Sequence, residues 1–344
     1  MTAAAADFDV GALGAYLAQH LEGLRLPLQV TRFRGGQSNP TYRLTDAAGA
    51  GYVLRKKPAG RLLPSAHAVE REYRVMKALE ASEVPVARMH CLCEDVSVIG
   101  TAFYVMEYVE GRIFWDPALP ELGPVERAGV YDDMNRVVAA LHRIDPAAVG
   151  LAEFGRPGNF MARQIERWTR QYRASATETV PAMERLIEWL PQHIPGDTTT
   201  TIFHGDLRLD NMIFHPTEPR VLAVLDWELS TLGHPLADFA YHALPWRLTA
   251  QQFRGMAEKD IASLGIPGER AYLQRYCERT GRAVGAAEWE FHIAYSLFRL
   301  AAILQGILKR ALDGTASSAQ AHETGSKAGL IAEVGWSQVR RLAS

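Results

Sequence analysis

A change in hydrophobic periodicity near residue 111 divides the sequence into two parts. In the first part, short apolar runs alternate with Gly, Asn and Pro, which is typical of β-strands joined by turns. We expect five strands, three of them in LPLQVTRFRGGQSNPTYRLT and GYVLRKKP and two at 86–93 and 101–109, and helices at 7–21 and 67–79. The first part is therefore predicted to be a β-sheet with one main helix, at 67–79.

Helical patterns prevail after residue 111. Residues 201–227 are the exception, because TIFHGDL, NMIFH and VLAVLDW contain the short apolar runs of strands. The small, polar stretch at 314–324 predicts a loop before a last helix. Apolar residues recur at three- and four-residue spacing in six segments, 127–143, 159–173, 182–190, 250–264, 269–280 and 286–312. We therefore predict two domains, 1–109 and 110–344.

The composition restricts the class of protein. Of the 344 residues, 48% are hydrophobic and 22% are charged, and the formal net charge of −2 argues against a nucleic-acid-binding protein. Three cysteines provide no disulfide framework and favour a reducing, cytoplasmic location. The stretch AYSLFRLAAILQGIL is interrupted by Arg299 and Gln305 and is too short for a membrane span, so we expect a buried helix and no membrane association.

One polar segment, FHGDLRLDNMIF at 203–214, lies between apolar flanks, and LDWE follows at 225–228. If Asp206 follows one strand and Asn211 begins the next, both side chains face one cleft, and Asp226 at the end of a neighbouring strand joins them. Asp and Asn oxygens are ligands that Mg²⁺ prefers, and phosphates and waters complete its coordination. One carboxylate is then left to accept a proton from an attacking hydroxyl, which is the arrangement that phosphoryl transfer requires.

HGDLRLDN followed by LDWE resembles the catalytic and metal loops of the aminoglycoside phosphotransferase-like kinases, relatives of the protein kinases. The resemblance implies a bilobal α+β fold, with a β-rich N-lobe and a larger helical C-lobe that carries a catalytic β-hairpin. It also implies ATP and Mg²⁺ as cofactors. By this resemblance Asp206 is the catalytic base, Asn211 and Asp226 bind Mg²⁺, and Arg208 contacts the transferred phosphate. The enzyme is then a small-molecule kinase.

The first part of the chain extends the resemblance to nucleotide binding. The phosphate-covering loop corresponds to RFRGGQSNPTYRL, with Gly35, Gly36 and Ser38 at its turn. Arg55 in GYVLRKKP stands where kinases carry a strand lysine, and Glu72 stands where a helix glutamate pairs with it. Lys57 lies on the same face of the strand, so it is a second candidate for this role.

YVMEYVEG resembles the hinge between the kinase lobes. The resemblance implies that Met106 lines the adenine site and that the Glu107 carbonyl and the Val109 N–H bind the adenine edge. Without the resemblance, the same residues are an apolar core strand.

The acceptor is less constrained than the nucleotide. Arg163, Arg167 and Arg170 share one face of the helix in NFMARQIERWTRQYR, and this face is either solvated or the wall of a pocket for an anionic acceptor. RQIERW and LDWELSTLGHPLAD resemble the kinase-like domains associated with acyl-CoA dehydrogenases. That resemblance implies a hydroxyacyl group on CoA as the acceptor and a functional link to such a dehydrogenase.

Three alternatives stay open at this stage. The first is a kinase for another acceptor: an aminoglycoside, a sugar or an amino alcohol. The second is a nucleotide-binding module without catalysis. The third is a metal hydrolase whose cluster would consist of His204, Asp206, Asp210, Asp226, His234 and Asp238. Against the third, the kinase resemblance assigns His204 and Asp238 to bracing the loop, and we expect Asp210 to be exposed.

Overall fold

The chain divides into two compact units in a computed structural model that describes residues 6–33, 39–58, 67–156, 158–316 and 318–342. The first unit comprises Met1–Arg112, Ile213–Pro216 and Leu222–Ser230. The second unit comprises Ile113–Met212, Thr217–Val221 and Thr231–Ser344. The segment with LDWE therefore belongs to the first unit, although it follows the catalytic-loop sequence by only a few residues.

A five-stranded sheet forms the centre of the first unit. The four strand pairs are all antiparallel. In spatial order the strands are β1 (Gln29–Arg32), β2 (Thr41–Thr45), β3 (Gly51–Lys56), β5 (Phe103–Glu107) and β4 (Met89–Cys93). All five strands expected from the short apolar runs between turn residues are present, which confirms this part of the prediction.

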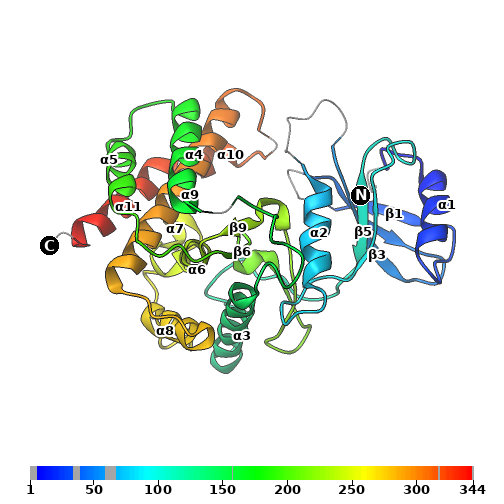
Figure 1. Cartoon of the computed structure of the whole chain (residues 1–344), viewed down its shortest axis with the longest axis horizontal. Coiled ribbons are helices and arrows are strands. Elements are labelled where there is room, and N and C mark those ends of the chain that lie inside the picture. Colours follow the sequence, from blue (N-terminus) through cyan, green and yellow to red (C-terminus); the bar gives the residue numbers. More distant parts are fainter. Residues whose placement is uncertain (1–5, 34–38, 59–66, 157, 317, 343–344) are drawn as a thin grey trace. The chain divides into compact units, whose positions relative to one another are not determined.

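Two helices, α1 (Val10–His20) and α2 (Val69–Leu79), cover opposite faces of this sheet (Figure 1). Leu13 and Leu17 of α1 pack against one face, in a core that includes Leu54 of β3. Because side chains alternate along a strand, Arg55 points to the other face, where α2 lies. The period-two pattern of GYVLRKKP thus places one cation of β3 beside the helix that carries Glu72.

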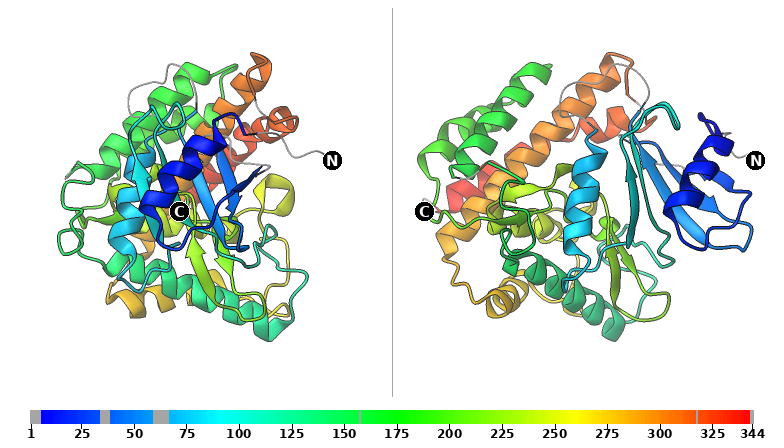
Figure 2. Two further views of the ribbon diagram at one scale, coloured as in Figure 1. Left: turned by 90° about the vertical axis from the view of Figure 1, so that its right-hand side faces the viewer. Right: turned by 45° about the vertical axis from the view of Figure 1, so that its right-hand side comes forward.

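The second unit is mainly helical, as predicted. Its longest helix, α9, is packed by α4, α6, α10 and α11, and Figure 2 shows the orange α9 with the green α4 beside it. The helices are α3 (Pro124–Arg143), α4 (Phe160–Ser175), α5 (Pro181–Trp189), α6 (Pro235–His242), α7 (Ala250–Phe253), α8 (Glu269–Thr280), α9 (Ala286–Leu312), α10 (Ala321–Gly325) and α11 (Ala328–Leu342), with short 3₁₀ turns η1 (Leu190–Gln192) and η4 (Leu244–Trp246).

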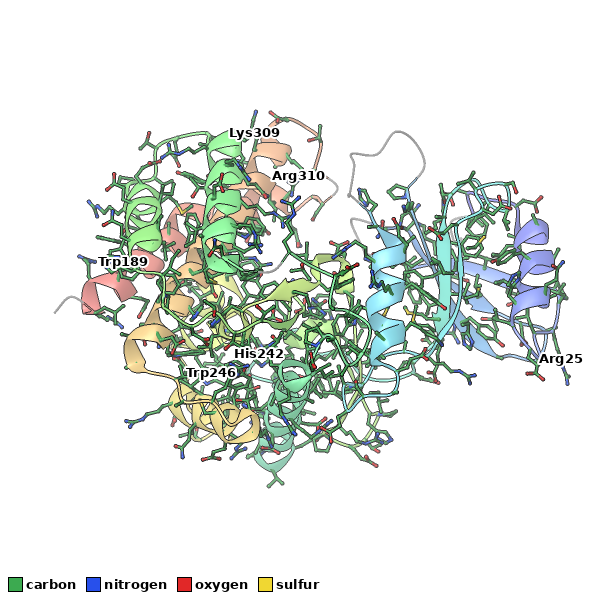
Figure 3. The ribbon with its side chains drawn as sticks, in the orientation of Figure 1. Arg25, Trp189, His242, Trp246, Lys309 and Arg310 are labelled. Carbon is green, nitrogen blue, oxygen red and sulfur yellow. The ribbon has the colours of Figure 1, made fainter. Side chains whose placement is uncertain are left out.

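Among the described residues, α9 is the one helix long and apolar enough to cross a membrane. Its most apolar 18-residue window has a mean hydropathy of 1.4, and 83% of that window is buried. Such burial is typical of a core helix in a folded protein. The basic last turn, with Lys309 and Arg310, lies at the edge of the unit, whereas His242 and Trp246 lie inside it (Figure 3).

Two small sheets interrupt the helical sequence. β6 (Thr201–Phe203) pairs antiparallel with β9 (Thr231–Gly233), and β7 (Met212–Phe214) pairs with β8 (Val221–Val224). The turns η2 (Leu209–Asn211) and η3 (Trp227–Leu229) precede β7 and follow β8. The predicted β-rich insert at 201–227 is present. However, β6 pairs with β9, which lies beyond residue 227.

One predicted helix, 250–264, is wrong over most of its length. The helix α7 ends at Phe253, because Arg254 adopts a left-handed conformation with φ 44° and Gly255 follows it. A Cβ atom at Gly255 would lie 1.8 Å from the carbonyl oxygen of Leu248. The chain therefore folds back against its own earlier segment, which a periodic apolar pattern does not reveal. The region predicted as a loop at 314–324 also contains the start of the short helix α10.

Candidate active site

The loop between β6 and β7 is held by its backbone. Asp238 of α6 accepts hydrogen bonds from the amides of His204, at 2.6 Å, and Gly205, at 2.9 Å. Arg299 of α9 donates to the carbonyl oxygen of Gly205. The ring Nδ1 of His204 accepts from the amide of Asp206, at 3.1 Å. His204 and Asp238 are fully buried, so the bracing roles expected of them are those that the structure shows.

Asp238 is ionised in this environment. Burial alone would raise the pKa of its carboxyl group, but hydrogen bonds and charge interactions with His142 and His204 lower that pKa below the usual value. The carboxylate therefore remains a strong acceptor for the two loop amides. The second brace, Arg299, was not assigned to the loop in the sequence analysis. Its sequence signal was an Arg in the apolar middle of α9.

The side chain of Asp206 projects from this fixed loop. Asn211 Nδ2 donates to the carboxylate oxygen Oδ2 of Asp206, at 2.9 Å, and to its backbone carbonyl, at 2.8 Å. Arg208 forms an ion pair with the same carboxylate, with Nε 2.9 Å from Oδ1, and donates from NH2 to Oδ2 at 3.0 Å. The Asp206 side chain retains 17% of its exposure. Arg208 and Asn211, the two other residues of HGDLRLDN with predicted roles in phosphoryl transfer, thus both contact one accessible carboxylate.

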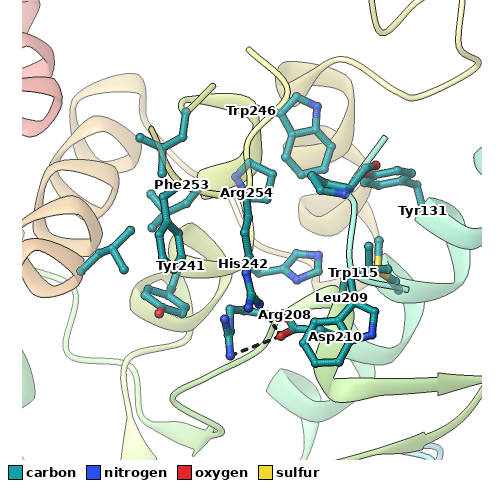
Figure 4. Close-up of a pocket in the computed structure, with 16 residues that line it drawn as sticks. Trp115, Tyr131, Arg208, Leu209, Asp210, Tyr241, His242, Trp246, Phe253 and Arg254 are labelled. Atoms are coloured by element: carbon teal, nitrogen blue, oxygen red, sulfur yellow. Dashed lines mark hydrogen bonds and ion pairs between the residues drawn. The ribbon is translucent and has the colours of Figure 1, made fainter. Parts of the chain in front are cut away.

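Asp210 is not exposed, contrary to the sequence expectation. Its side chain is only 9% exposed and forms ion pairs with Arg254, at 2.5 Å, and with Arg208, at 3.5 Å (Figure 4). Burial lowers the pKa of Arg208, but the carboxylates of Asp206 and Asp210 outweigh burial and raise that pKa. Arg208 therefore carries a permanent positive charge between two acids. Arg254 is far away in sequence, so no local pattern indicated this pair.

An apolar cavity in the second unit begins at Asp210 and the two arginines that pair with it. Figure 4 shows Trp115, Tyr131, Trp246 and Phe253 around it, with Asp210 bonded to Arg208 and Arg254 at one side. The rest of its wall is formed by Pro117, Met134, Leu209, Tyr241, His242, Leu244, Pro245, Leu248 and Leu300. The cavity therefore offers a largely apolar surface that ends in polar groups.

Arg55 is the centre of a charge cluster in the first unit. Its guanidinium lies 2.9 Å from Glu72, 3.1 Å from Asp226 and 3.3 Å from Glu228. The predicted ion pair between Arg55 and Glu72 is therefore present. Lys57 instead pairs with Glu70, at 2.9 Å. The sequence did not decide whether Arg55 or Lys57 takes the place of the strand lysine. Arg55 is the one that contacts Glu72.

Glu72 is held by two further side chains that the sequence analysis missed. Asn39 Nδ2 donates to it at 2.7 Å, and the Tyr104 hydroxyl donates at 3.1 Å. Burial raises the pKa of the Glu72 carboxyl group to about 7; Arg55 opposes this rise, while Asp226 and Glu228 add to it. Asn39 precedes β2 and Tyr104 lies in β5, and no sequence spacing relates them to α2.

Asp226 occupies an unusual backbone conformation at the start of η3, with φ 64° and ψ 60°. Its side chain is 36% exposed, that of Glu228 is 27% exposed, and both share Arg55. Three carboxylates around one guanidinium leave an excess of negative charge, and carboxylate oxygens suit a hard divalent cation. Asp226 therefore fits the predicted Mg²⁺ role, and Glu228 is a further candidate ligand. Asn211 belongs to the second unit, so its share in this site stays a prediction.

The remaining nucleotide contacts also stay predictions. Gly35, Gly36 and Ser38 lie outside the described residues. Met106 and Glu107 form the end of β5. Val109 follows that strand and is partly buried.

The arginine face of α4 does not line the cavity beside Arg208. Arg163 bonds the carbonyl oxygens of Arg156 and Gly158. Arg167 lies over the Trp168 ring, with its guanidinium carbon 5.4 Å from the ring centroid. Arg170 is 70% exposed and pairs with Glu166. The solvated alternative therefore describes this face better, and the argument for an anionic acceptor that rested on it falls away.

The six residues of the hydrolase alternative do not form one cluster. His204 and Asp238 are committed to the loop backbone, and Asp210 is paired with arginines. Asp226 belongs to the first unit, and His234 contacts Asp197. The arrangement that remains is a carboxylate on a braced loop in one unit and a basic–acidic cluster beside a sheet in the other.

The α+β fold, the braced loop that carries Asp206 and the charge cluster around Arg55 define a small-molecule phosphotransferase of the kinase-like fold. The model of the phosphotransferase enzyme family matches residues 29–287, and the chain belongs to this family.

Curated relatives include the mouse acyl-CoA dehydrogenase family member 10, which is 50% identical over 328 residues. This match covers 94% of the chain and 30% of the mouse protein. The rat acyl-CoA dehydrogenase family member 11 is 44% identical, over 98% of the chain and 44% of its own length. The chain thus spans less than half the length of these relatives.

Among solved structures, a proposed aminoglycoside phosphotransferase from Ralstonia eutropha JMP134 is 56% identical, with a TM-score of 0.90. The match covers 97% of this chain and 99% of that one. An aminoglycoside phosphotransferase in a complex with AMP-PNP and hygromycin B is 16% identical, with a TM-score of 0.60 over 94% of this chain and 98% of that one. At that identity the likeness concerns the fold alone.

Proposed function

We propose that this kinase transfers the γ-phosphate of ATP to the hydroxyl group of a hydroxyacyl chain carried on CoA. Asp206 accepts the proton of the acceptor hydroxyl as the new oxygen–phosphorus bond forms and the bond to the leaving ADP oxygen breaks. Arg208 neutralises charge on the transferred phosphoryl group, and Arg55 holds the phosphates of the nucleotide. Mg²⁺, held through Asp226, would neutralise the phosphate oxygens.

The braced loop supports the role of Asp206. Its backbone is anchored by Asp238 and Arg299, while its carboxylate remains accessible. A base on a rigid support stays aligned with the acceptor hydroxyl and loses little entropy when the substrate binds.

The observation that carries the choice of acceptor is the apolar cavity. Its wall is built mainly of aromatic and aliphatic side chains, which suit an acyl chain. An aminoglycoside is a polycation and would require several free acids. Asp210, the one carboxylate among the described residues of this wall, is already paired with Arg208 and Arg254. The cavity therefore favours an apolar acceptor with a polar end over a cationic one.

The names of the curated relatives support the CoA part of the proposal. Two of them are acyl-CoA dehydrogenase family members that contain a segment like this chain within a longer protein. A phosphate on the acyl hydroxyl would make that oxygen a better leaving group for elimination. We infer that the phosphorylated product is passed to an enzyme of the acyl-CoA dehydrogenase class.

A panel of acceptors tests this proposal. ADP release would be measured with hydroxyacyl-CoA esters of several chain lengths, the free hydroxy acids, CoA, kanamycin, glucose and ethanolamine, and the product would be identified by mass spectrometry. We expect turnover with the hydroxyacyl-CoA esters. Turnover with kanamycin, glucose or ethanolamine and none with any CoA ester would refute the acceptor assignment.

Two matched tryptophan variants connect the acceptor to the cavity. Trp115 lines the cavity and is 63% exposed, so Trp115→Ala should leave the fold intact. We expect it to raise the KM for the acyl acceptor about tenfold, by removing apolar contact area, and to leave the KM for ATP unchanged. Trp189→Ala, on α5, is the control and should change neither constant. Equal effects of the two variants would argue against the cavity as the acceptor site.

A further inference from the structure

Two buried histidines of the second unit are not used by the phosphotransfer site. His292 of α9 is fully buried, and neither of its ring nitrogens has a hydrogen-bond partner among the described residues. His234, which immediately follows β9, is 3% exposed, and its Nδ1 is also buried without a described partner. The two rings stack with centroids 4.6 Å apart. Leaving buried nitrogens unpaired is costly, so this pair requires an explanation.

A carboxylate lies beside the two rings. Glu288 precedes His292 by four residues on α9, so both side chains leave the same face of the helix. Ligand atoms of Glu288, His292 and His234 all lie within 4.8 Å of one another. In a tetrahedral zinc site the ligand atoms are about 3.4 Å apart, as Zn–N bonds of about 2.0–2.1 Å dictate. The two rings are nearly parallel, at 13°, so closing the site requires a rotation of one imidazole as well as of the half-buried Glu288.

The second nitrogen of His234 is already oriented. Its Nε2 lies 3.2 Å from a carboxylate oxygen of Asp197. Asp197 is in turn fixed by the amide and hydroxyl of Thr199, at 2.8 and 2.6 Å. Metal-binding histidines commonly donate their other N–H to a carboxylate, which directs the remaining lone pair at the ion. The unpartnered Nδ1 of His234 is the atom that this arrangement leaves for a ligand bond.

We propose that His234, Glu288 and His292 form a binding site for a divalent metal of the Zn²⁺ class. Two imidazole nitrogens and one carboxylate oxygen are a donor set that suits Zn²⁺ better than Mg²⁺, which prefers oxygen ligands alone. A cavity lined by 158–162 and 194–200, with His234 in its wall, provides an entry path and room for a water ligand.

The position of this site assigns it a structural role. His234 lies four residues before Asp238 on α6, and His292 lies seven residues before Arg299 on α9. Asp238 and Arg299 are the two side chains that brace Gly205. An ion bound here joins α9 to the start of α6, one helical turn from Asp238 and about two turns from Arg299. The site therefore stabilises the support of the catalytic loop without contacting the substrates.

Metal binding without nucleotide tests the inference. The full chain would be dialysed against a chelator and titrated with Zn²⁺ by calorimetry, and Co²⁺ would be added separately to record visible d–d absorption. We expect one Zn²⁺ per chain, a higher melting temperature with Zn²⁺, and the intense absorption of a four-coordinate Co²⁺ site. The absence of saturable Zn²⁺ binding would overturn the proposal.

Variants locate the ion. Glu288→Gln removes a ligand from a half-buried position and should weaken Zn²⁺ binding at least about 100-fold, and Asp197→Asn about 10–100-fold. His292→Ala should abolish binding; if this variant does not fold, the other two still decide. The control Glu278→Gln changes an exposed residue of α8 and should leave the affinity within about twofold. Unchanged Zn²⁺ binding in both Glu288→Gln and Asp197→Asn would refute the assignment.

A second control separates this site from the predicted Mg²⁺ site. Asp226→Asn changes the first unit and should leave the Zn²⁺ stoichiometry at one. Loss of Zn²⁺ binding in this variant would place the ion at Asp226 and would overturn the proposal. The result does not depend on the identity of the acceptor, because no acceptor or nucleotide is present.

Discussion

The Asp206 loop and the Arg55 cluster hold their charged groups in different ways. In the loop, Asp238 and Arg299 bind backbone groups, so the loop keeps its shape whatever its side chains contact. In the cluster, Arg55 is held by the side chains of Glu72, Asp226 and Glu228. Phosphate oxygens can replace such partners. A fixed backbone suits a base that must stay aligned, and exchangeable side-chain pairs suit a site that admits a nucleotide.

The largest expected effect concerns the base on the fixed loop. Asp206→Asn should lower kcat by about 10²–10⁴-fold, because the amide cannot accept the hydroxyl proton, and should leave the KM for ATP nearly unchanged. Steady-state ADP release with a working acceptor measures this. Asp210→Asn, in the same loop, is the matched control and should lower kcat by less than about tenfold. Similar losses of kcat in the two variants would contradict the assignment of Asp206 as the base and Asp210 as a residue of the cavity wall.

The next effect concerns the backbone support itself. Asp238→Ala leaves the buried amides of His204 and Gly205 without their acceptor and should lower the free energy of unfolding by roughly 2–5 kcal/mol. Urea unfolding followed by circular dichroism measures the loss. Asp260→Ala, at an exposed position, should stay within about 0.5 kcal/mol of the wild type. A comparably small loss in Asp238→Ala would show that the loop does not depend on this carboxylate.

A smaller effect is expected from the exchangeable cluster. Arg55→Ala should raise the KM for ATP about 10–100-fold, since a charge-assisted contact to phosphate contributes about 1.5–3 kcal/mol. Arg55→Lys should recover part of this loss. Lys57→Ala should change the KM less than about twofold, because Lys57 pairs with Glu70 rather than Glu72. A larger effect at Lys57 than at Arg55 would reverse the assignment of the phosphate-binding cation.

The smallest effect is a pH dependence centred on Glu72. Because its folded-state pKa is raised to about 7, the folded protein holds this proton more tightly than the unfolded chain does. The stability contributed by the protonated group is complete below the unfolded pKa and is lost as the pH rises through about 7. The unfolding free energy of the wild type minus that of Glu72→Gln should therefore decrease between pH 5 and pH 8. A difference that stays flat or increases over this range would contradict the raised pKa.

Local patterns predicted most elements of the fold. Short apolar runs between turn residues identified the five strands of the first unit. The helices α8 and α9 have the predicted boundaries. Features that depend on distant segments were missed. The helix predicted at 250–264 stops where Gly255 meets Leu248, and β6 pairs with β9 rather than with the next strand along the chain.

The candidate site shows the same limit. HGDLRLDN and LDWE identified Asp206, Asn211 and Asp226, because spacing within a loop is local. The residues that hold the rest of the site come from segments 32 to 94 residues away, and no local periodicity marks such pairs. Asn39 and Tyr104 bind Glu72, Arg254 binds Asp210, and Arg299 binds the Gly205 carbonyl. A buried charge in an apolar helix, as at Arg299, was the one local signal of a long-range partner.

The burial of α9 has a consequence for how the protein is made. On the ribosome, α9 emerges before α10 and α11, which later cover it. During that interval the face of this 27-residue helix that α10 and α11 cover is exposed to water, and the helix meets the length and hydropathy of a membrane span. Exposed apolar surface of this size favours aggregation, so α10 and α11 keep α9 out of contact with other chains. A chain cut after Leu312 is expected to aggregate even though its catalytic loop is complete.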